Sequence, residues 1–294
     1  MKVTGFTFVR NAIRNDYPVL ESLRSLLPLC DEVVVAVGRS DDDTLGLIRG
    51  LNSPKIRIVE TVWDDTLREG GRVLAQETDK ALAAVPADSD WAIYLQADEV
   101  LHEQDYEAIR AGLARYRDAP DVDGLLLSYQ HFYGTYDYVG DNPRWYRREV
   151  RVVRPGRQVY SYRDAQGFRR ADDQKLRVKL LPATVYHYGW VKQPRAMQHK
   201  NQTFGRLWHS DEYMARHVAD EKQAAAEYDF SQIDSLQPFA GTHPAVMTAR
   251  IARQNWRYEH DPARIRYRLK DHLRLWVEQQ TGYRLWEYRN YILS

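Results

Sequence analysis

The sequence has very little cysteine, no excess charge of either sign and no long hydrophobic run. Cys30 is the only cysteine among 294 residues, which excludes an internal disulfide and a zinc site built from several cysteines. The 42 Lys and Arg residues are balanced by 41 Asp and Glu, whereas nucleic-acid-binding proteins normally carry a clear basic excess. No apolar stretch reaches the roughly 18 residues that span a bilayer, and no signal peptide is visible. We therefore expect a soluble, cytoplasmic protein that does not bind nucleic acid.

Aromatic side chains, in contrast, are abundant. The chain holds 20 Tyr and 8 Trp residues. Such rings offer flat surfaces for sugars or bases, and they equally fill hydrophobic cores. Composition leaves both uses open.

Strand and helix patterns alternate through the first hundred residues. Four short apolar runs are typical of buried strands, at residues 5–10, 33–37, 56–60 and 91–95. Apolar residues at helical spacing follow each of the first three runs. They lie after a possible cap at Asn15-Asp16, over residues 45–51, and after Gly70-Gly71. This alternation predicts an α/β fold with a mainly parallel sheet flanked by helices. In such sheets ligands bind beyond the carboxyl ends of the strands.

The pattern changes after residue 120. Strand-like runs lie between long polar and aromatic loops, at 122–129, 150–154 and 183–188, and we expect them to extend the sheet in mixed sense. After Pro194 the spacing predicts helices near 211–228, 243–258 and 263–280. The expected organisation is one domain over residues 1–200 and a helical C-terminal extension over 201–294 packed on it.

The strand at 91–95 runs directly into a pair of carboxylates, Asp98 and Glu99. Carboxylate oxygens at a strand end beside an open crevice are well placed to hold Mg²⁺ or Mn²⁺. The alternative is that both residues only end the strand and cap the segment that follows. The strand by itself does not separate the two readings.

Four local patterns occur in the order seen in family 2 glycosyltransferases of GT-A fold. Arg10-Asn11 with the leucine-rich helix after it resembles the opening segment of that family, and Ser40–Thr44 looks like its S-x-D-x-T turn. Gln96-Ala97-Asp98 occupies the place of the D-x-D motif. Tyr186–Lys192 resembles the late histidine segment that often supplies a metal ligand. The resemblance covers roughly residues 3–200 and leaves the C-terminal region unexplained.

This resemblance implies a GT-A fold and transfer of a sugar, in a hexosyltransferase-like reaction, from a nucleotide-diphosphate donor to an acceptor hydroxyl. Relatives commonly build bacterial surface polysaccharides, so the implied acceptor is a saccharide, lipid-linked in some cases. Carried over by position, Asp98 would bind a divalent metal, Mn²⁺ or Mg²⁺, and His187 would complete its coordination. The alternative for His187 is a core histidine satisfied by its aromatic neighbours. Arg10 and Asn11 would contact the donor.

Two departures from the family pattern affect the donor site. Gln96 replaces the first carboxylate of the D-x-D motif, and its amide would ligate a metal without charge or contact the ribose instead. Where many members place an aspartate against the nucleobase, this sequence has Val37-Gly38-Arg39. The sequence therefore does not indicate which nucleotide the donor carries. Asp42 is expected to cap the helix that begins near Thr44.

Basic residues at three places are candidates to bind the diphosphate. Arg72, with Gln76 one turn later, lies in the first turns of the helix after Gly70-Gly71, where the helix N-terminus favours phosphates. Lys192 and Arg195 follow the late histidine and could clamp the diphosphate from a loop. The alternative for all of them is a solvated surface position.

An inverting transfer needs a carboxylate that takes the proton of the acceptor hydroxyl. Asp164 lies between the metal motif and His187, in the region where family members place that base. Asp137 and Glu149 are the reserve candidates. Because arginines stand nearby, Asp164 could equally be an ion-paired loop residue.

The C-terminal region contains a basic amphipathic helix pattern. Ile265, Leu269, Leu273 and Trp276 fall on one face, and basic residues crowd the remainder, at Arg264, Arg266, Arg268, Lys270 and Arg274. Such a helix can lie on an anionic membrane, here the inner membrane surface, where a lipid-linked acceptor would be found. The alternative is that the apolar face packs on the protein itself.

Two other functions stay open. A sugar nucleotidyltransferase would use a similar sheet, but such enzymes carry a glycine-rich loop after the first strand and Phe8–Arg14 contains no glycine. A non-catalytic nucleotide- or carbohydrate-binding relative is favoured by Gln96 alone. A turnover assay would separate it from an enzyme.

Overall fold

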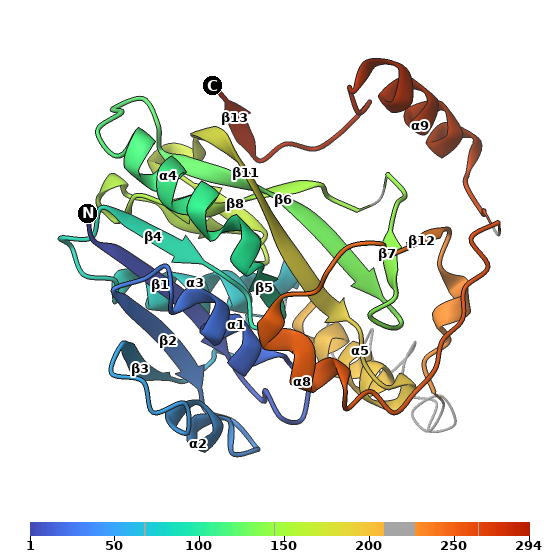
Figure 1. Ribbon diagram of the computed structural model, residues 1–294. Coiled ribbons are helices and arrows are strands. Elements are labelled where there is room, and N and C mark those ends of the chain that lie inside the picture. The colour runs from blue at the N-terminus through green and yellow to red at the C-terminus, as the bar shows by residue number, and fades with distance from the viewer. Residues whose placement is uncertain (68, 144, 209–226, 264) are drawn as a thin grey trace.

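Four strands pair in parallel at the centre of a mixed sheet. In the computed structural model, β1 (Val3–Val9) lies between β2 (Glu32–Gly38) and β4 (Trp91–Tyr94), and β3 (Ile56–Thr61) pairs with β2 (Figure 1). The structure describes residues 1–67, 69–143, 145–208, 227–263 and 265–294. β1 and β4 are buried along their whole length, as continuous apolar runs predict for strands covered on both faces. The expected α/β fold with helices flanking the sheet is confirmed.

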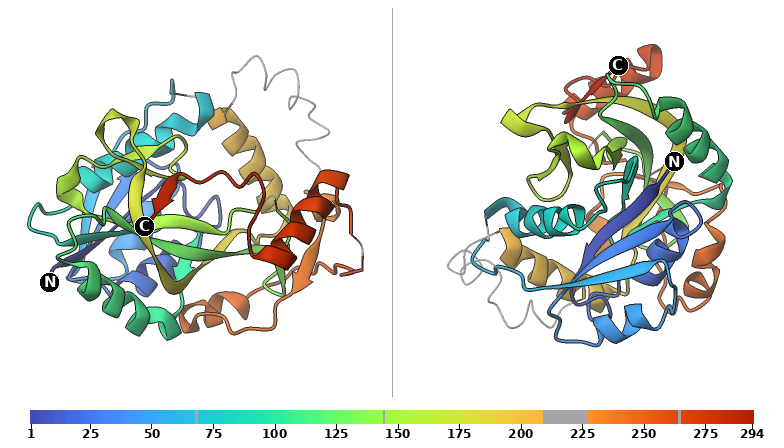
Figure 2. Two further views of the ribbon diagram at one scale, coloured as in Figure 1. Left: turned by 90° about the horizontal axis from the view of Figure 1, so that it is seen from above. Right: turned by 90° about the vertical axis from the view of Figure 1, so that its left-hand side faces the viewer.

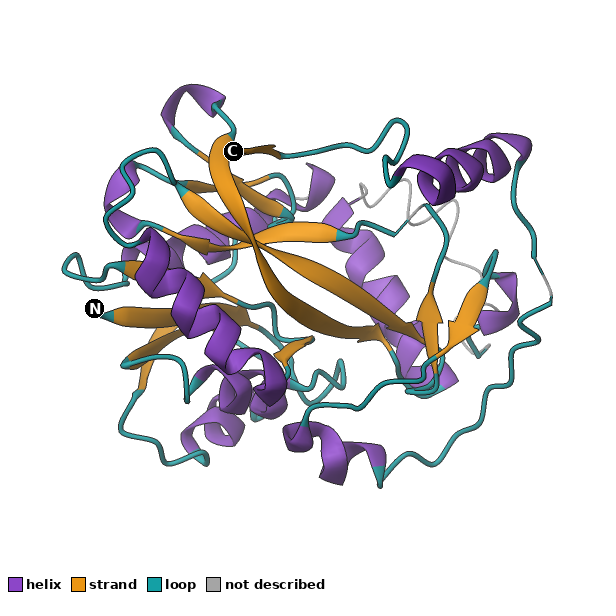
Figure 3. Ribbon diagram, turned by 45° about the horizontal axis from the view of Figure 1, so that its top comes forward, coloured by secondary structure: helices purple, strands orange, loops and turns teal. Residues whose placement is uncertain are grey.

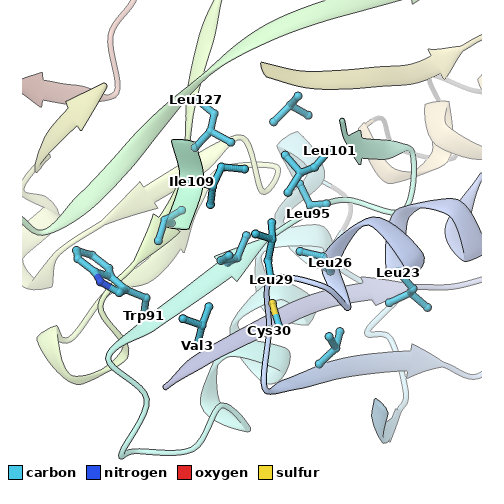
Figure 4. Close-up of a cluster of buried hydrophobic side chains, with 14 of the residues drawn as sticks. Val3, Leu23, Leu26, Leu29, Cys30, Trp91, Leu95, Leu101, Ile109 and Leu127 are labelled. Atoms are coloured by element: carbon cyan, nitrogen blue, oxygen red, sulfur yellow. The ribbon is translucent and has the colours of Figure 1, made fainter. Parts of the chain in front are cut away.

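Helices cover both faces of this sheet. The apolar sides of α1 (Val19–Leu26), α2 (Thr44–Arg49) and α4 (Tyr106–Tyr116) pack in one core cluster with the strands, part of which is drawn in Figure 4. α3 (Arg72–Ala83) packs in a second cluster on the opposite face. Figure 2 shows α3 and α4 on either side of the sheet. The sheet is therefore the middle layer of three.

Two expected helix starts differ in detail. α1 begins at Val19, with Pro18 as its N-cap and no side-chain cap, so the expected cap at Asn15-Asp16 is wrong. The α2 cap is Asp43, whose side chain accepts from the Gly46 amide at 3.0 Å. Asp42 instead accepts from the amide of Thr44, at 3.0 Å, and from the amide of Arg14, at 2.8 Å. Asp42 thus ties the helix start to the loop after β1.

The later strands extend the sheet in mixed sense, as expected. β8 (Arg148–Val153) is antiparallel to β4 and to β6 (Gly124–Tyr133), and β6 is parallel to the long β11 (Leu176–Trp190). β5 (Glu99–Leu101) pairs antiparallel with β11. Together the described residues form a sheet of 11 strands. β11 begins earlier than expected, and its first residues pair with β13 and with the start of β6.

Smaller elements border this sheet. β9 (Tyr160–Tyr162) and β10 (Gly167–Arg169) form a separate antiparallel hairpin, and β7 (Tyr138–Gly140) pairs with β6. Short 3₁₀ turns lie at Glu69–Gly71, Glu103–Asp105, Pro155–Arg157, Ala171–Asp173, Phe230–Gln232 and Ala245–Met247.

The described part of the C-terminal region is less helical than predicted. α5 (Pro194–Trp208) crosses residue 200, so the division there stays a prediction, and most of the helix expected at 211–228 lies outside the described residues. Over 243–258 the helix is only α8 (Thr248–Ile251) after one 3₁₀ turn, whereas the last expected helix is present as α9 (Leu269–Thr281).

Two short C-terminal strands join the main sheet. β12 (Leu236–Pro238) pairs with β7, and β13 (Tyr291–Leu293) pairs with β11. Aromatic core clusters also connect this region to the sheet, so many aromatic side chains fill cores. Among the described helices none is both long and apolar enough to cross a bilayer.

Candidate functional site

A cavity of about 850 Å³ opens at the carboxyl ends of β1 and β4, where ligands bind in sheets of this kind. Its walls come from the segments after these two strands, from the turn between β9 and β10, from β11 and from α5. Six of the residues singled out in the sequence line it: Arg10, Asn11, Gln96, Asp98, Asp164 and His187. The fold thus collects side chains that lie far apart in the sequence.

Asp98 and His187 face each other across the β5–β11 pairing. The backbone amide of Tyr188 donates to the Asp98 carbonyl at 2.8 Å, which brings the two segments into register. His187 Nε2 then lies 3.8 Å from Asp98 Oδ1. A Cβ built on Gly189 would lie 2.6 Å from Asp98 Oδ2 and 2.7 Å from His187 Nε2. Only glycine therefore leaves the space beside both groups open.

A second histidine determines which nitrogen of the His187 ring carries the proton. His131 Nε2 lies 2.8 Å from the carbonyl oxygen of Tyr146, which only accepts, so this nitrogen donates. Its Nδ1 then accepts from His187 Nδ1 at 3.0 Å, because burial lowers the pKa of His131 well below its usual value and keeps the ring neutral. His187 Nε2 is left with a lone pair directed at Asp98 and the cavity. No sequence motif singles out His131, which lies within β6.

Lys200 on α5 supplies a cation that sequence reasoning missed. Its Nζ donates to Asp98 Oδ2 at 3.3 Å and to the Gly189 carbonyl at 2.9 Å. Burial by itself would raise the pKa of Asp98, but nearby positive charges, that of Lys200 above all, outweigh it and lower the pKa to about 2. Asp98 is therefore an ionised acceptor at any pH near neutral.

Asp98 and His187 fit a divalent cation as two protein ligands. A carboxylate oxygen and an imidazole lone pair converge on a space that a single Cβ would fill. Among the described residues, no group of three or more His, Cys, Asp and Glu side chains is arranged to hold a metal. The remaining ligands would therefore have to come from a bound molecule or from water.

Glu99 has a structural role. It is fully buried and accepts from Arg151 at 2.9 and 2.8 Å, from the Tyr129 hydroxyl at 2.8 Å and from the Gln96 amide at 3.0 Å. All of its acceptor capacity is directed inward. Of the carboxylate pair at the strand end, only Asp98 faces the cavity.

Arg10 and Asn11 lie at the end of β1. Arg10 donates to Asp65 at 2.7 Å and lies over the Trp63 ring, 5.5 Å from its centre. Asn11 exchanges hydrogen bonds with Asp41: its Nδ2 donates to the carboxylate at 3.2 Å, and its Oδ1 accepts from the Asp41 amide at 2.7 Å. Trp63 and Asp65 also line the cavity, and neither residue belongs to a motif that the sequence analysis recognised.

Asp164 and Gln96 meet at the turn between β9 and β10. Asp164 is carried at this turn and lines the cavity, and burial raises the pKa of its carboxyl. Gln96 Nε2 donates to the Ala165 carbonyl at 3.2 Å. The amide of Gln96 is thus directed at the turn backbone.

The structure does not bring Arg72, Lys192 or Arg195 to the cavity wall. Arg72 is exposed at the start of α3. Lys192 is fully buried: its Nζ donates to the Asp16 carbonyl at 2.6 Å, and burial lowers its pKa well below the usual value. Arg195 is exposed and pairs with Glu227 at 3.0 Å. Among the described residues, Lys200 takes the place expected of these cations.

The remaining candidates also lie off the cavity wall. Gln76 is half-buried on α3, Asp137 accepts from the Thr135 hydroxyl at 3.0 Å, and Glu149 is buried within β8. Asp164 is therefore the one predicted base that the described cavity contains.

Comparison with solved structures finds likenesses at low sequence identity. The chain is similar to S. aureus TarS, with 14% identity over 69% of this chain and a TM-score of 0.41; it spans 39% of that chain. It is similar to glucosyl-3-phosphoglycerate synthase from Mycobacterium tuberculosis, solved with Mn²⁺, UDP and phosphoglyceric acid, with 17% identity, a TM-score of 0.30 and 44% and 43% of the two chains covered.

It is also similar to 4-diphosphocytidyl-2C-methyl-D-erythritol synthase from Anaerococcus prevotii, with 14% identity, a TM-score of 0.39 and 69% and 94% of the chains covered. No protein-family model and no curated protein sequence matches the chain.

Proposed function

We propose that this protein transfers a sugar from a nucleotide-diphosphate donor to a saccharide hydroxyl. One observation carries the proposal. A single cavity at the carboxyl ends of parallel strands holds Asp98 with its two neighbours, His187 and Lys200, and also a separate, half-buried carboxylate, Asp164. With a divalent cation held by Asp98 and His187, the first group can bind an anionic leaving group, and the second can accept a proton.

The diphosphate is proposed to bind beside Asp98. Lys200 offers a positive charge at 3.3 Å from the carboxylate, inside a site that is largely shielded from water. A divalent cation, Mn²⁺ or Mg²⁺, held by Asp98 and His187 would neutralise the charge that develops on the departing nucleoside diphosphate. His131 keeps the proton off His187 Nε2 and so keeps that nitrogen able to bind a cation.

Asp164 is proposed as the base. Its carboxyl lines the same cavity, and burial raises its pKa from the value of an ordinary aspartate toward neutral pH. A carboxylate with a raised pKa takes the proton of an attacking hydroxyl more effectively than a fully solvated one. The acceptor oxygen bonds to the anomeric carbon while the bond from that carbon to the diphosphate oxygen breaks, and the nucleoside diphosphate leaves. The proton of the acceptor hydroxyl moves to a carboxylate oxygen of Asp164.

Aromatic side chains line the cavity at positions suited to flat ligands. Trp63 lies under the Arg10 guanidinium, and Tyr146, whose ring is 4.4 Å from that of His131, lines the cavity together with Trp190. A base would stack at the first pair and a sugar at the second, since both present faces to aromatic rings. Arg10 and Asn11 are then donor-side residues, as the resemblance implies.

The acceptor is proposed to be lipid-linked in a bacterial surface polysaccharide pathway, with the protein on the cytoplasmic side of the membrane. Support comes from α9, which loops join to the rest of the chain on both sides (Figures 1 and 3). Leu269, Leu273 and Trp276 are 90%, 48% and 61% exposed on one face of this helix. Exposed cations, Arg266, Arg268 and Lys270, lie beside them. An anionic bilayer matches both the apolar and the basic side chains.

Membrane contact is tested by sedimentation with vesicles of phosphatidylcholine alone or with added phosphatidylglycerol. We expect binding only to the anionic vesicles, and loss of binding in Leu273→Glu with Trp276→Glu. Equal sedimentation of the double variant and the wild type would contradict the assignment of α9.

The enzymatic proposal is tested by calorimetric titration of UDP and GDP with Mn²⁺ and with chelator, followed by a transfer assay with the donor that binds. Binding strengthened by Mn²⁺, together with release of nucleoside diphosphate, supports the proposal. Binding without turnover across acceptors favours a binding relative, for which the amide at Gln96 is the supporting feature. Pyrophosphate release from a nucleoside triphosphate and a sugar phosphate would instead indicate a nucleotidyltransferase.

A further inference from the structure

The turn that carries Asp164 has an unusual backbone. Arg163 and Ala165, on either side of Asp164, both have positive φ, 56° and 64°, in a region that side chains other than glycine rarely adopt. Neither residue is a glycine, so the backbone itself does not favour this shape. Contacts from outside the turn must hold it.

Two side-chain donors reach the turn from the sheet. Gln96 Nε2 donates to the Ala165 carbonyl at 3.2 Å, and Arg151 Nη1 donates to the Gln166 carbonyl at 3.2 Å. Arg151 is itself fixed by its paired bonds to Glu99. The methyl group of Ala165 is fully buried in the core cluster that contains α3. The turn is thus held on its inner side by hydrogen bonds and packing.

A glycine packs closely against the outer side of the same turn. Gly71 has a φ of 70°, and a Cβ built on it would lie 2.8 Å from Asp164 Cβ. The start of α3 therefore lies directly against the Asp164 side chain. Between Gly71 and the donors from the sheet, Asp164 has little freedom to leave the cavity wall.

The residue type at position 96 fits this contact. A glutamine amide donates to a carbonyl oxygen, whereas a carboxylate only accepts and would meet the Ala165 oxygen with like partial charge. Position 96 also lies beside Glu99, whose carboxylate accepts the Gln96 backbone amide at 3.0 Å. A second carboxylate here would add charge repulsion. The amide is therefore suited to the contact that the turn needs.

We propose that Gln96 is a positioning residue whose amide holds the turn at residues 163–166, so that the Asp164 carboxylate faces the cavity. It acts through Asp164 and not as a ligand of the metal or the donor. This inference rests on the proposed function, in which Asp164 is the base. It explains why an amide stands where the resemblance would place a carboxylate.

The test compares Gln96→Ala and Gln96→Glu with wild type and with a matched control, Gln279→Ala, at an exposed position on α9. The first readout needs no activity: the rate at which trypsin cuts after Arg163, an exposed residue at the turn, followed by mass spectrometry of the fragment. We expect both Gln96 variants to be cut at least about fivefold faster, because the turn opens more often. The control variant should be cut at the wild-type rate, and the melting temperature of every variant should equal that of the wild type.

The second readout separates positioning from ligand binding. We expect kcat to fall about 10- to 100-fold in both variants while the Kd for the nucleoside diphosphate with Mn²⁺ stays within about twofold, since only the base is misplaced. A weakened Kd with unchanged cleavage after Arg163 would overturn the proposal and make Gln96 a ligand.

A Gln96→Glu variant that behaves as wild type in both readouts would also overturn the proposal. If Gln96→Ala does not fold, the similarly sized Gln96→Glu decides alone. If wild type neither binds UDP or GDP nor transfers a sugar, the proposed function fails, and the cleavage rates still decide whether Gln96 holds the turn.

Discussion

Glu149 offers a direct test of the electrostatics beneath the cavity. Its side chain is buried in β8, and Oε2 has no hydrogen-bond partner among the described residues. Burial raises the pKa of this carboxyl to about 8, with Glu99 and Asp164 adding to the effect and Arg151 opposing it. Glu149 is therefore mostly protonated at neutral pH in the folded protein and ionised in the unfolded chain.

The consequence for stability has a definite sign. Between the unfolded pKa near 4.5 and the folded pKa of about 8, the native state binds more protons than the unfolded state, so stability falls as pH rises through this window. At pH 7, about 2.5 pH units above the unfolded pKa, the free energy of unfolding is lower by roughly 3 kcal/mol than at acid pH. Above pH 8 this loss of stability is constant at about 5 kcal/mol. Glu149→Gln, which is neutral at every pH, avoids this loss.

We therefore expect Glu149→Gln to equal the wild type in stability near pH 4.5 and to exceed it by roughly 3 kcal/mol at pH 7. Urea unfolding at intervals from pH 4.5 to pH 9 measures the difference directly. Glu107→Gln, at an exposed position on α4, is the control and should change stability by less than about 0.5 kcal/mol throughout. A difference between Glu149→Gln and wild type that does not grow with pH would refute the reasoning.

Three further predictions concern the cavity. Asp98→Ala should abolish the Mn²⁺ dependence of nucleoside diphosphate binding in calorimetry while the circular dichroism spectrum stays native; a retained dependence would remove Asp98 from the metal site. His131→Phe should weaken Mn²⁺-dependent binding about 10-fold, because His187 loses the acceptor that fixes its proton; His187→Ala should do the same, and unfolding of that variant would make His187 a core residue instead. Asp164→Asn should bind donor normally but lose turnover by at least about 100-fold, and near-normal turnover would exclude it as the base.

The central sheet could be predicted from the sequence because its cause is local. Uninterrupted apolar runs such as Val33–Val37 form strands only where both faces are covered, and the alternation with helical spacing then dictates parallel pairing. Details that depend on three-dimensional packing were not predictable in this way. β11, for example, begins at Leu176, seven residues before the predicted strand, and its first three residues pair with β13 near the end of the chain.

Within the site, the sequence alone determined which chemical groups stand at strand ends. Asp98 follows a buried strand directly, so its position at the sheet edge was fixed by the local pattern. His187 and Asp164 needed the family resemblance in addition, and only the fold shows that both line the same cavity as Asp98. The roles of those residues stay predictions for the experiments above.

Tertiary structure alone decided which partners each of these groups meets. Lys200, and not Lys192, pairs with Asp98, because the buried Lys192 Nζ donates to the Asp16 carbonyl, whereas α5 carries Lys200 to the cavity. His131 reaches His187 only through the parallel pairing of β6 with β11. Such contacts join residues tens of positions apart, and no local pattern encodes them, since hydrogen bonding and burial depend on the folded geometry rather than on spacing along the chain.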